Sequence, residues 1–252
     1  MIDVQDIDGV VQLTFEHGKV NALDVEFLKA LEERFRELQT SRPKAVILTG
    51  AGPAFSAGVD LQRLLDEESD YASQLLQALD GALLAIFTAP FPVVAAINGH
   101  AIAGGFVIAC ACDHRIMSKG KARVGVPELL VGVPWPTLAL EVVRQAFAPN
   151  RSHELLLFGE THTATDAYER ELVDRLEEPD RLIEVALKLA TKLGSIDSAA
   201  FQSAKALLRQ PTLDRLARIG PERAAEVERS WRSPETKQLI QTYFEKAVGR
   251  SS

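Results

Sequence analysis

A unit made of an apolar strand, a glycine-rich loop and a helix occurs twice in the first half of the chain. Residues 45–50 form a mainly apolar run, as in strands buried on both faces, and the glycine-rich loop 50–60 leads from it into a helix. The apolar run 93–97, the loop 98–105 and an apolar helix over 106–112 repeat the same order. Strands that alternate with helices favour a parallel α/β core, built here from a repeated turn of chain.

The neighbouring segments fit the same fold class. Residues 10–15 alternate as a half-buried strand would, and residues 114–118 follow the second helix as another strand. Asp24 is a good N-cap for a helix with one apolar face, and Asp60 has the same place before the helix that follows the first loop. The apolar face of the helix after Asp24 consists of Phe27, Leu28, Leu31, Phe35 and Leu38.

Composition places the chain among ordinary globular proteins. Of its 252 residues, 46% are hydrophobic and 25% are charged, which excludes disordered, collagen-like and disulfide-scaffold chains. No apolar run reaches the roughly 18 residues that cross a bilayer, and Met1 is followed by Ile2 and Asp3 rather than by a basic and then apolar leader. We therefore expect a cytoplasmic protein without a membrane partner.

Charge and residue types exclude further classes of function. The formal net charge of −7 would repel a polyanion, so nucleic acid is not an expected partner. Cys110 and Cys112 lie two apart in an expected helix and point in different directions, so we expect buried thiols rather than a disulfide. The histidines form no HExxH motif and there is no CxxC, so no metal site is expected.

The last part of the chain is helical in character. Apolar residues recur at helical spacing beyond about residue 190, and Ser233 followed by Pro234 is a typical helix start. Packing on the chain's own core and contact with another copy both fit the apolar side chains of the final helix. We expect a core with the substrate site over residues 1–190 and a helical oligomerisation region over 191–252. The apolar side chains in question are Leu239, Ile240, Tyr243 and Phe244.

The two glycine-rich loops carry the first chemical signal. Each follows a strand and opens a helix, so its free backbone N–H groups can point at a single negative charge. Neither loop has the GxxxxGK[ST] or GxGxxG spacing of phosphate and dinucleotide sites, which excludes both of those functions. One loop alone fits a simple tight turn equally well, but the pairing of Val59 with Gly104 favours an oxyanion hole.

Two segments are distinctive as motifs: Phe-Ser-Ala-Gly-Val-Asp-Leu at residues 55–61, and Ile-Asn-Gly at 97–99 with Ala-Gly-Gly at 103–105. They resemble the signatures of the crotonase superfamily, which is the enoyl-CoA hydratase/isomerase family, and the resemblance covers most of the chain. It implies a spiral of ββα repeats with a C-terminal helical trimerisation region, and hence a homotrimer or a dimer of trimers. Asp113 and Arg115 resemble a pair common to many activities, and we expect them to form a structural ion pair.

The same resemblance implies an acyl-CoA thioester as substrate. Its thioester oxygen is expected between the backbone N–H groups of Val59 and Gly104, and each such donor is typically worth about 2.7 to 4 kcal/mol in an enolate-forming transition state. The backbone of Phe55, Ser56 and Ala57 is expected to hold the CoA. Because CoA is part of the substrate, no separate cofactor is expected.

Enolate chemistry also needs a base, and the family has acids at two positions. The first corresponds to Val107, which cannot accept a proton. The second corresponds to Glu128, which alone would suggest a solvated loop residue but with the resemblance is the expected base, its pKa raised by partial burial. One carboxylate suits isomerisation, since hydration uses two to hold water. The chain therefore most resembles the Δ3,Δ2-enoyl-CoA isomerases, which share a stretch like residues 133–136, and Trp135 is expected to contact substrate.

Two alternative functions fit the same residues. An enoyl-CoA hydratase or another crotonase-type lyase would need a substitute acid, for which Asp66, Glu67 and Glu68 are candidates, although such a run is usually a solvated face. A non-catalytic CoA-binding subunit would need no acid. Lys19 and Lys246 are further candidates for contacts to the CoA phosphates.

Overall fold

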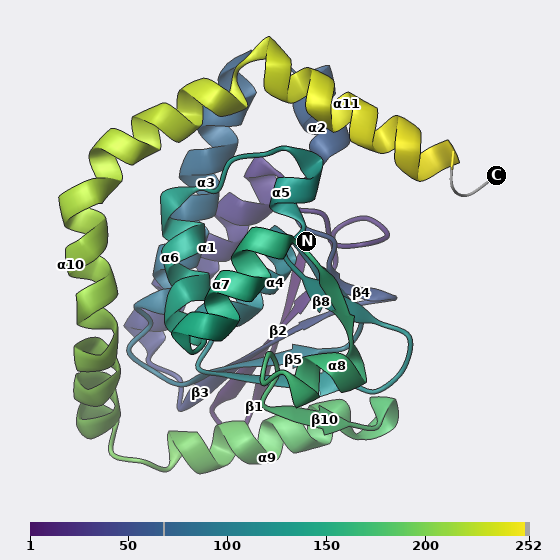
Figure 1. The fold of residues 1–252 in the computed structure, drawn as a ribbon. Helices are drawn as coiled ribbons and strands as arrows, with labels where there is room; N and C mark the ends of the chain where they lie inside the picture. The colour runs from purple at the N-terminus through teal and green to yellow at the C-terminus, as the bar shows by residue number, and fades with distance from the viewer. Residues whose placement is uncertain (68, 250–252) are drawn as a thin grey trace.

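The computed structural model describes residues 1–67 and 69–249 and has two β-sheets at its centre (Figure 1). The larger sheet has the strand order β1-β2-β3-β5-β7-β10, and the smaller one has the order β4-β6-β8-β9. The larger sheet consists of β1 (Ile2–Ile7), β2 (Val10–Phe15), β3 (Ala45–Gly50), β5 (Val93–Ile97), β7 (His114–Ser118) and β10 (Arg175–Glu177). The smaller sheet consists of β4 (Ala54–Ser56), β6 (His100–Ile102), β8 (Arg123–Gly125) and β9 (Thr161–Thr163).

Successive turns of the chain add one strand to each sheet. The chain passes from β3 to β4, from β5 to β6 and from β7 to β8, and helices then return it to the start of the next turn. Strands β2, β3, β5, β7 and β10 pair in parallel with one another, as the alternation of strands and helices predicts. The expected α/β spiral of ββα units is therefore present.

The edge strand β1 is one element that the sequence pattern does not predict. It pairs antiparallel with β2, and its four central residues are exposed. Both faces of these residues meet solvent, and apolar and polar residues alternate only over residues 2–5, which is a weak strand signal. Its partner β2, which faces the core, does show that alternation.

Helices cover the sheets, and two of them begin at the predicted caps. The Asp24 carboxylate accepts a hydrogen bond from the backbone N–H of Phe27 at 2.8 Å, and the Asp60 carboxylate accepts one from that of Arg63 at 2.9 Å. All residues of α4 are buried. The helices of the core are α1 (Val25–Ser41), α2 (Leu61–Asp66), α3 (Ser69–Phe87), α4 (Gly104–Ala111), α5 (Glu128–Val131), α6 (Thr137–Ala146), α7 (Pro149–Phe158) and α8 (Ala164–Glu169).

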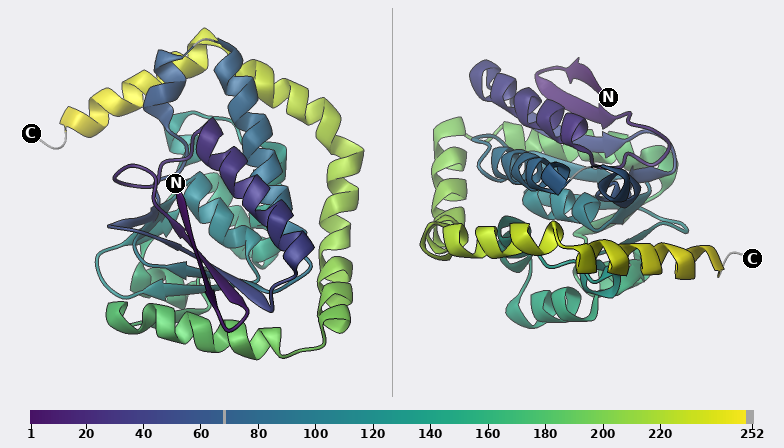
Figure 2. Two further views of the ribbon diagram at one scale, coloured as in Figure 1. Left: turned by 180° about the vertical axis from the view of Figure 1, so that it is seen from behind. Right: turned by 90° about the horizontal axis from the view of Figure 1, so that it is seen from above.

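Three long helices of the tail run around the core on three sides (Figures 1 and 2). They are α9 (Leu182–Gly194), α10 (Ser198–Trp231) and α11 (Pro234–Gly249), and the short helix η1 (Pro179–Arg181) precedes them. Helix α9 spans residue 190 and buries an apolar face against the larger sheet. The predicted cap of α11 is present, because the Ser233 hydroxyl accepts a hydrogen bond from the backbone N–H of Thr236 at 3.2 Å.

The predicted ion pair between Asp113 and Arg115 is wrong. The Asp113 carboxylate instead binds Lys205 at 2.7 Å and Arg209 at 2.6 Å, both from α10, whereas Arg115 binds Asp174 at 3.1 Å. The two cations on α10 lie about ninety residues further along the chain. Asp113 therefore pairs with residues that are distant in sequence, and these ion pairs hold α10 against the core.

The two cysteines are packing residues of the core. Cys110 and Cys112 are buried free thiols, and burial raises the pKa of each to about 12, so they pack as neutral side chains. Within residues 1–67 and 69–249, no cluster of three or more His, Cys, Asp or Glu side chains is arranged to hold a metal ion. None of the helices described in that same span is both long and apolar enough to cross a membrane.

Candidate active site

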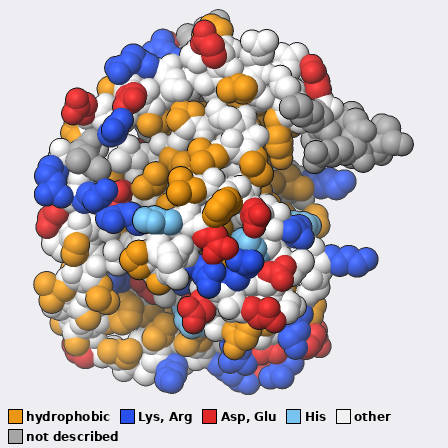
Figure 3. Space-filling view, viewed as in Figure 1, with side chains coloured by type: hydrophobic (Ala, Val, Ile, Leu, Met, Phe, Trp, Pro, Cys, Tyr) orange, Lys and Arg blue, Asp and Glu red, His pale blue; other side chains and the backbone are white. Residues whose placement is uncertain are grey.

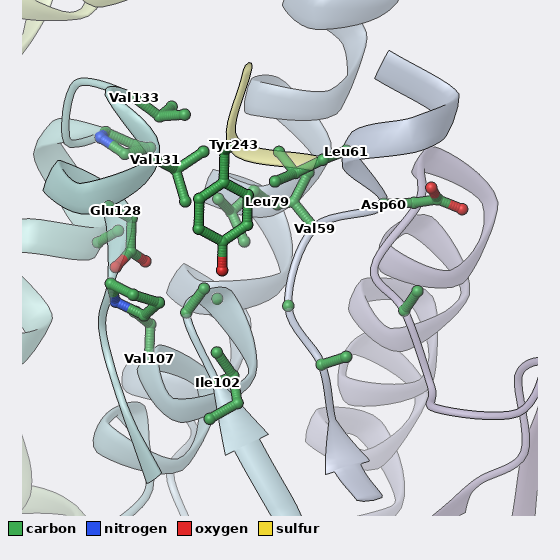
Figure 4. Close-up of a pocket in the computed structure, with 18 of the residues that line it drawn as sticks. Val59, Asp60, Leu61, Leu79, Ile102, Val107, Glu128, Val131, Val133 and Tyr243 are labelled. Carbon is green, nitrogen blue, oxygen red and sulfur yellow. The ribbon is translucent and has the colours of Figure 1, made fainter. Parts of the chain in front are cut away.

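A largely apolar pocket of about 340 Å³ lies between the two glycine-rich loops, helix α5 and the tail (Figure 4). Both predicted oxyanion residues, Val59 and Gly104, line it, and so does Glu128. The other side chains that form its walls are mostly aliphatic or aromatic. They include Leu61, Leu79, Ile102, Val107, Val131, Val133, Pro136, Trp231, Tyr243 and Phe244.

Gly58 lets the two loops approach each other closely. Its φ is +84°, and a Cβ there would lie 2.7 Å from the carbonyl oxygen of Ile102 and 3.2 Å from the backbone nitrogen of Gly104. No L side chain fits that space without moving backbone. The glycine therefore brings the amide of Val59, the next residue, close to the start of α4.

The amides of Val59 and Gly104 are available to a ligand. Leu23 pairs with the first loop through the Gly58 carbonyl and the Asp60 N–H, which leaves the intervening N–H of Val59 unused. Gly104 is the first residue of α4, where backbone N–H groups have no partner inside the helix. Among the described residues, neither amide donates a hydrogen bond. The two donors and the positive end of the α4 dipole can thus meet one oxygen atom.

Ala103 has a strained backbone immediately before this helix. Its φ is +51° and its ψ is −129°, although it is not a glycine. Such a conformation costs on the order of 1–3 kcal/mol and persists only where the surroundings impose it, often at functional sites. The hydrogen bond from the Ala103 N–H to the Gly125 carbonyl, at 2.8 Å, helps to hold it. The sequence gives no sign of this strain, because alanine is rare in that region.

Glu128 brings a carboxyl group into the apolar pocket from the first position of α5. Although the residue as a whole is half-buried, its Oε2 atom is buried and has no hydrogen-bond partner among the described residues. Burial raises the pKa of this carboxyl from 4.5 to about 8. Val107 lies in the same pocket, so the structure places a hydrocarbon side chain where a second acid would stand.

Of the three residues predicted to hold the CoA, one lines the pocket and two are buried beneath the first loop. Ala57 lines the pocket, whereas the side chains of Phe55 and Ser56 are fully buried beneath the first loop. The Ser56 hydroxyl donates to the Asn21 carbonyl at 2.7 Å and accepts from the N–H of Gly58 at 3.2 Å. Ser56 therefore supports the loop, and neither Phe55 nor Ser56, each 0% exposed with its backbone included, presents atoms to a ligand in this chain.

Trp135 does not face this pocket. The chain bends between Pro134 and Pro136, so that Pro136 lines the pocket while Trp135 lines a separate hollow against α10, beside Arg215 and Val227. The expectation that Trp135 contacts substrate is therefore corrected. Pro134 and Trp135 line that hollow and Pro136 lines the pocket, so neighbours in this stretch face different surfaces.

The candidate substitute acids also lie away from the pocket. Asp66 accepts hydrogen bonds from the Gln62 amide, Glu67 binds Arg63 at 3.4 Å, and both are exposed. Glu68 lies outside the described residues. Of the two candidate contacts for CoA phosphates, Lys19 is exposed beside the first loop, and the side chain of Lys246 lies outside the described part of the chain.

Tail residues in the pocket are the main feature that sequence reasoning missed. Trp231 from α10, with Tyr243 and Phe244 from α11, lines the same space as Glu128, and Ile240 is fully buried within this chain. The apolar residues of the final helix indicated that it packs against another surface. Nothing local to that helix indicates which part of the chain, far away in sequence, it covers.

Comparison with known proteins gives one family. A model of the enoyl-CoA hydratase/isomerase family matches residues 5–249. A putative enoyl-CoA hydratase of Thermus thermophilus is 32% identical over 99% of this chain and 100% of its own length. The mitochondrial enoyl-CoA delta isomerase 1 of Rattus norvegicus is 27% identical over 82% of this chain and 73% of its own.

Solved structures agree on the fold. The crystal structure of human mitochondrial delta3-delta2-enoyl-CoA isomerase superposes with a TM-score of 0.90, covering 100% of this chain and 99% of that one at 24% identity. With the spiral fold, the paired loops and the family match along nearly the whole sequence, the chain belongs to the enoyl-CoA hydratase/isomerase family of the crotonase superfamily.

Proposed function

We propose that the protein isomerises 3-enoyl-CoA to trans-2-enoyl-CoA with Glu128 as the single base. The observation that carries this proposal is the Glu128 carboxyl, which has no hydrogen-bond partner among the described residues and lies in an apolar pocket. In the same described part of the chain, the amides of Val59 and Gly104 that reach this pocket donate no hydrogen bond either. Moving a double bond requires one group that takes a proton and returns it. It requires no group that holds water.

In this mechanism the thioester oxygen accepts hydrogen bonds from the N–H groups of Val59 and Gly104. Negative charge grows on that oxygen when a proton leaves C2 and a dienolate forms. Fixed backbone donors need no reorganisation at that moment, and each contributes about 2.7 to 4 kcal/mol by analogy with other oxyanion sites. Val59 can have any tolerated side chain, since only its backbone acts.

Glu128 carries the proton between two carbons of the same substrate molecule. Its ionised carboxylate takes the proton from C2, so the C2–H bond breaks and an O–H bond forms on the carboxyl. The neutral carboxyl then gives that proton to C4, where a new C–H bond forms and the electrons return from the enolate. A pKa of about 8 suits both steps near neutral pH, because the group is neither a strong acid nor a strong base.

The surroundings of Glu128 favour isomerisation over hydration. Two-carboxylate hydratases hold water between acids, whereas here Val107 is apolar and the exposed Asp66 and Glu67 are bound elsewhere. The relatives bear both names, since one is a putative hydratase and another an enoyl-CoA delta isomerase. The names of the relatives do not distinguish the two reactions, so the proposal of isomerisation depends on the residues that line the pocket.

The test is incubation of the protein with 3-enoyl-CoA and, separately, with trans-2-enoyl-CoA, followed by mass analysis of the products. We expect an isomer of unchanged mass from the first and little or no addition of water to the second. Glu128→Gln should lower isomerisation by about 100-fold or more. Efficient hydration by the wild type would establish a hydratase, and CoA binding without any turnover would establish a binding subunit.

We also propose assembly through the tail into a homotrimer or a dimer of trimers. Leu207 and Leu208 on α10 are 72% and 70% exposed, and Leu130, Leu157 and Phe158 are exposed on α5 and α7. Figure 3 shows hydrophobic side chains gathered across the face where α5 and α7 lie. Light scattering should give a multiple of three chains, and a monomer at working concentration would contradict this proposal.

A further inference from the structure

Two hollows of opposite character meet at Tyr243. The first is the apolar pocket of about 340 Å³ that contains Glu128, and the second is a hollow of about 660 Å³ on the neighbouring surface. Ile102, Pro127 and Tyr243 line both of them. The remaining wall of the second hollow is mostly polar and consists of Arg123, Glu160, Thr161, His162, Asp166 and Arg170, with Leu130 and Gly159.

The ring of Tyr243 occupies this boundary from above. Figure 4 shows it descending from α11 between Glu128 on one side and Val59 on the other, with its hydroxyl directed toward Ile102. The residue is 37% exposed, as expected for a ring with one face on the apolar pocket and one toward the polar hollow. No hydrogen bond to its hydroxyl is formed within the described part of the chain.

Contacts of the residues that precede Tyr243 hold α11 in place. Ile240 is fully buried, and Leu239 packs on Gly132, where a Cβ would lie 2.9 Å from its Cδ1 atom. Gly132 ends the short helix that Glu128 begins, so α11 rests directly on the element that carries the base. The Lys237 ammonium donates to the Glu67 carbonyl at 3.0 Å. The ring is thus placed by a fixed helix and not by a loose end.

The pocket behind the ring is suited to exclude water. Of its lining side chains that can donate hydrogen bonds, Gln62 binds Asp66 and the indole N–H of Trp231 binds the Pro134 carbonyl at 2.8 Å. The Tyr243 hydroxyl is the remaining one among the described residues. A proton held on Glu128 is therefore surrounded mainly by hydrocarbon, and water that exchanges it must come from outside.

We infer that the ring of Tyr243 is the wall that keeps water in the polar hollow away from the reacting carbons. It makes the proton taken by Glu128 return to the same substrate molecule and suppresses addition of water to the product. This inference rests on the proposed isomerisation, and it assigns Tyr243 as a residue that determines the outcome of the reaction. The part of Tyr243 that acts is the ring and not the hydroxyl.

The first test runs the isomerisation of 3-enoyl-CoA in D₂O and measures deuterium at C4 of the product by mass spectrometry. Tyr243→Ala joins the two hollows, so deuterium at C4 should rise several-fold, and hydration of trans-2-enoyl-CoA should become detectable. Tyr243→Phe keeps the ring, and its product should contain as little deuterium at C4 as that of the wild type. Tyr168→Ala removes an exposed tyrosine ring of α8 and is the matched control. Equal deuterium in wild type and Tyr243→Ala would overturn the inference.

A second measurement does not depend on activity. The chain has two tryptophans, and Trp135→Phe leaves the fluorescence of Trp231, which lines the apolar pocket and is 3% exposed. In that background, Tyr243→Ala should increase acrylamide quenching of Trp231 several-fold, and Tyr243→Phe should not. Unchanged quenching would refute the role of the Tyr243 ring as a barrier to water, whether or not the protein isomerises 3-enoyl-CoA. Increased quenching in a protein without isomerase activity would support that role and refute the proposed function alone.

Discussion

Replacing the buried base should make the protein more stable while it removes activity. Glu128→Gln exchanges a titrating carboxyl for a neutral amide of nearly the same shape. In the native protein burial raises the pKa of Glu128 to about 8, whereas the unfolded chain releases that proton near 4.5. Between these pH values the native state binds more protons than the unfolded state, so this group makes the protein less stable as pH rises.

The size of the effect follows from the difference between the two pKa values. Each pKa unit corresponds to about 1.36 kcal/mol, so the full difference between the two pKa values corresponds to about 5 kcal/mol. Integrating between the two pKa values gives a penalty of about 1 kcal/mol at pH 5, about 3 at pH 7 and about 4 at pH 8. Glu128→Gln does not have this penalty, so its advantage over the wild type should grow with pH.

Urea unfolding followed by circular dichroism at pH 5, 7 and 8 measures this difference in the free energy of unfolding. The control is Glu33→Gln on the exposed face of α1, which should differ from the wild type by the same small amount at every pH. If the free energies of unfolding of Glu128→Gln and the wild type differ by the same amount at every pH, the claim that burial raises the pKa of Glu128 is refuted. A variant that becomes less stable as pH rises would refute it as well.

Four further predictions concern the same site and its support. The value of kcat/KM should rise about tenfold per pH unit below the pKa of Glu128 and level off above pH 8, because the base must be ionised; a flat profile between pH 6 and 8 would contradict this. Gly104→Val should abolish turnover by placing a branched side chain in the pocket, while Val59→Ala keeps its N–H and should cost far less; steady-state kinetics separate the two, and equal losses would remove these amides from the oxyanion hole. Gly58→Ala should reduce both turnover and thermal stability, because its φ is +84° and its Cβ would meet backbone at 2.7 Å; a fully active, stable variant would show that the loops need not touch. Asp113→Ala leaves two buried cations without a carboxylate and should destabilise the protein by about 3–5 kcal/mol in urea unfolding; a loss under 1 kcal/mol would mean that α10 is held mainly by apolar contacts.

Elements with a local sequence signal could be predicted from the chain alone. Strands β3 and β5 are apolar runs, and each is followed at once by a short glycine-rich loop, so the parallel α/β core and the amides of Val59 and Gly104 could be predicted without a structure. The spiral of ββα units needed the family resemblance as well. The caps at Asp24 and Asp60 are equally local, since each side chain binds an amide three residues away. Glu128 needed the family resemblance as well, because a lone glutamate before leucines has no distinctive pattern.

Features that depend on distant contacts could not be predicted in this way. Tyr243 enters the pocket only because α10 crosses one side of the core and α11 returns over the top (Figure 1). The partners of Asp113 on α10 and the outward turn of Trp135 are set by the same packing. The positive φ of Ala103 leaves no trace in hydrophobic periodicity, and the exposed strand β1 leaves only a short alternation over residues 2–5.

The central claim is that one carboxyl carries one proton from C2 to C4, and the fate of that proton tests it most directly. Substrate 3-enoyl-CoA deuterated at C2 is converted in ordinary water, and the label in the product is located by NMR. We predict that the wild type transfers deuterium to C4 of the trans-2-enoyl product and that Glu128→Gln forms almost no product. A product without any label at C4, or equal label transfer by Glu128→Gln, would contradict the account.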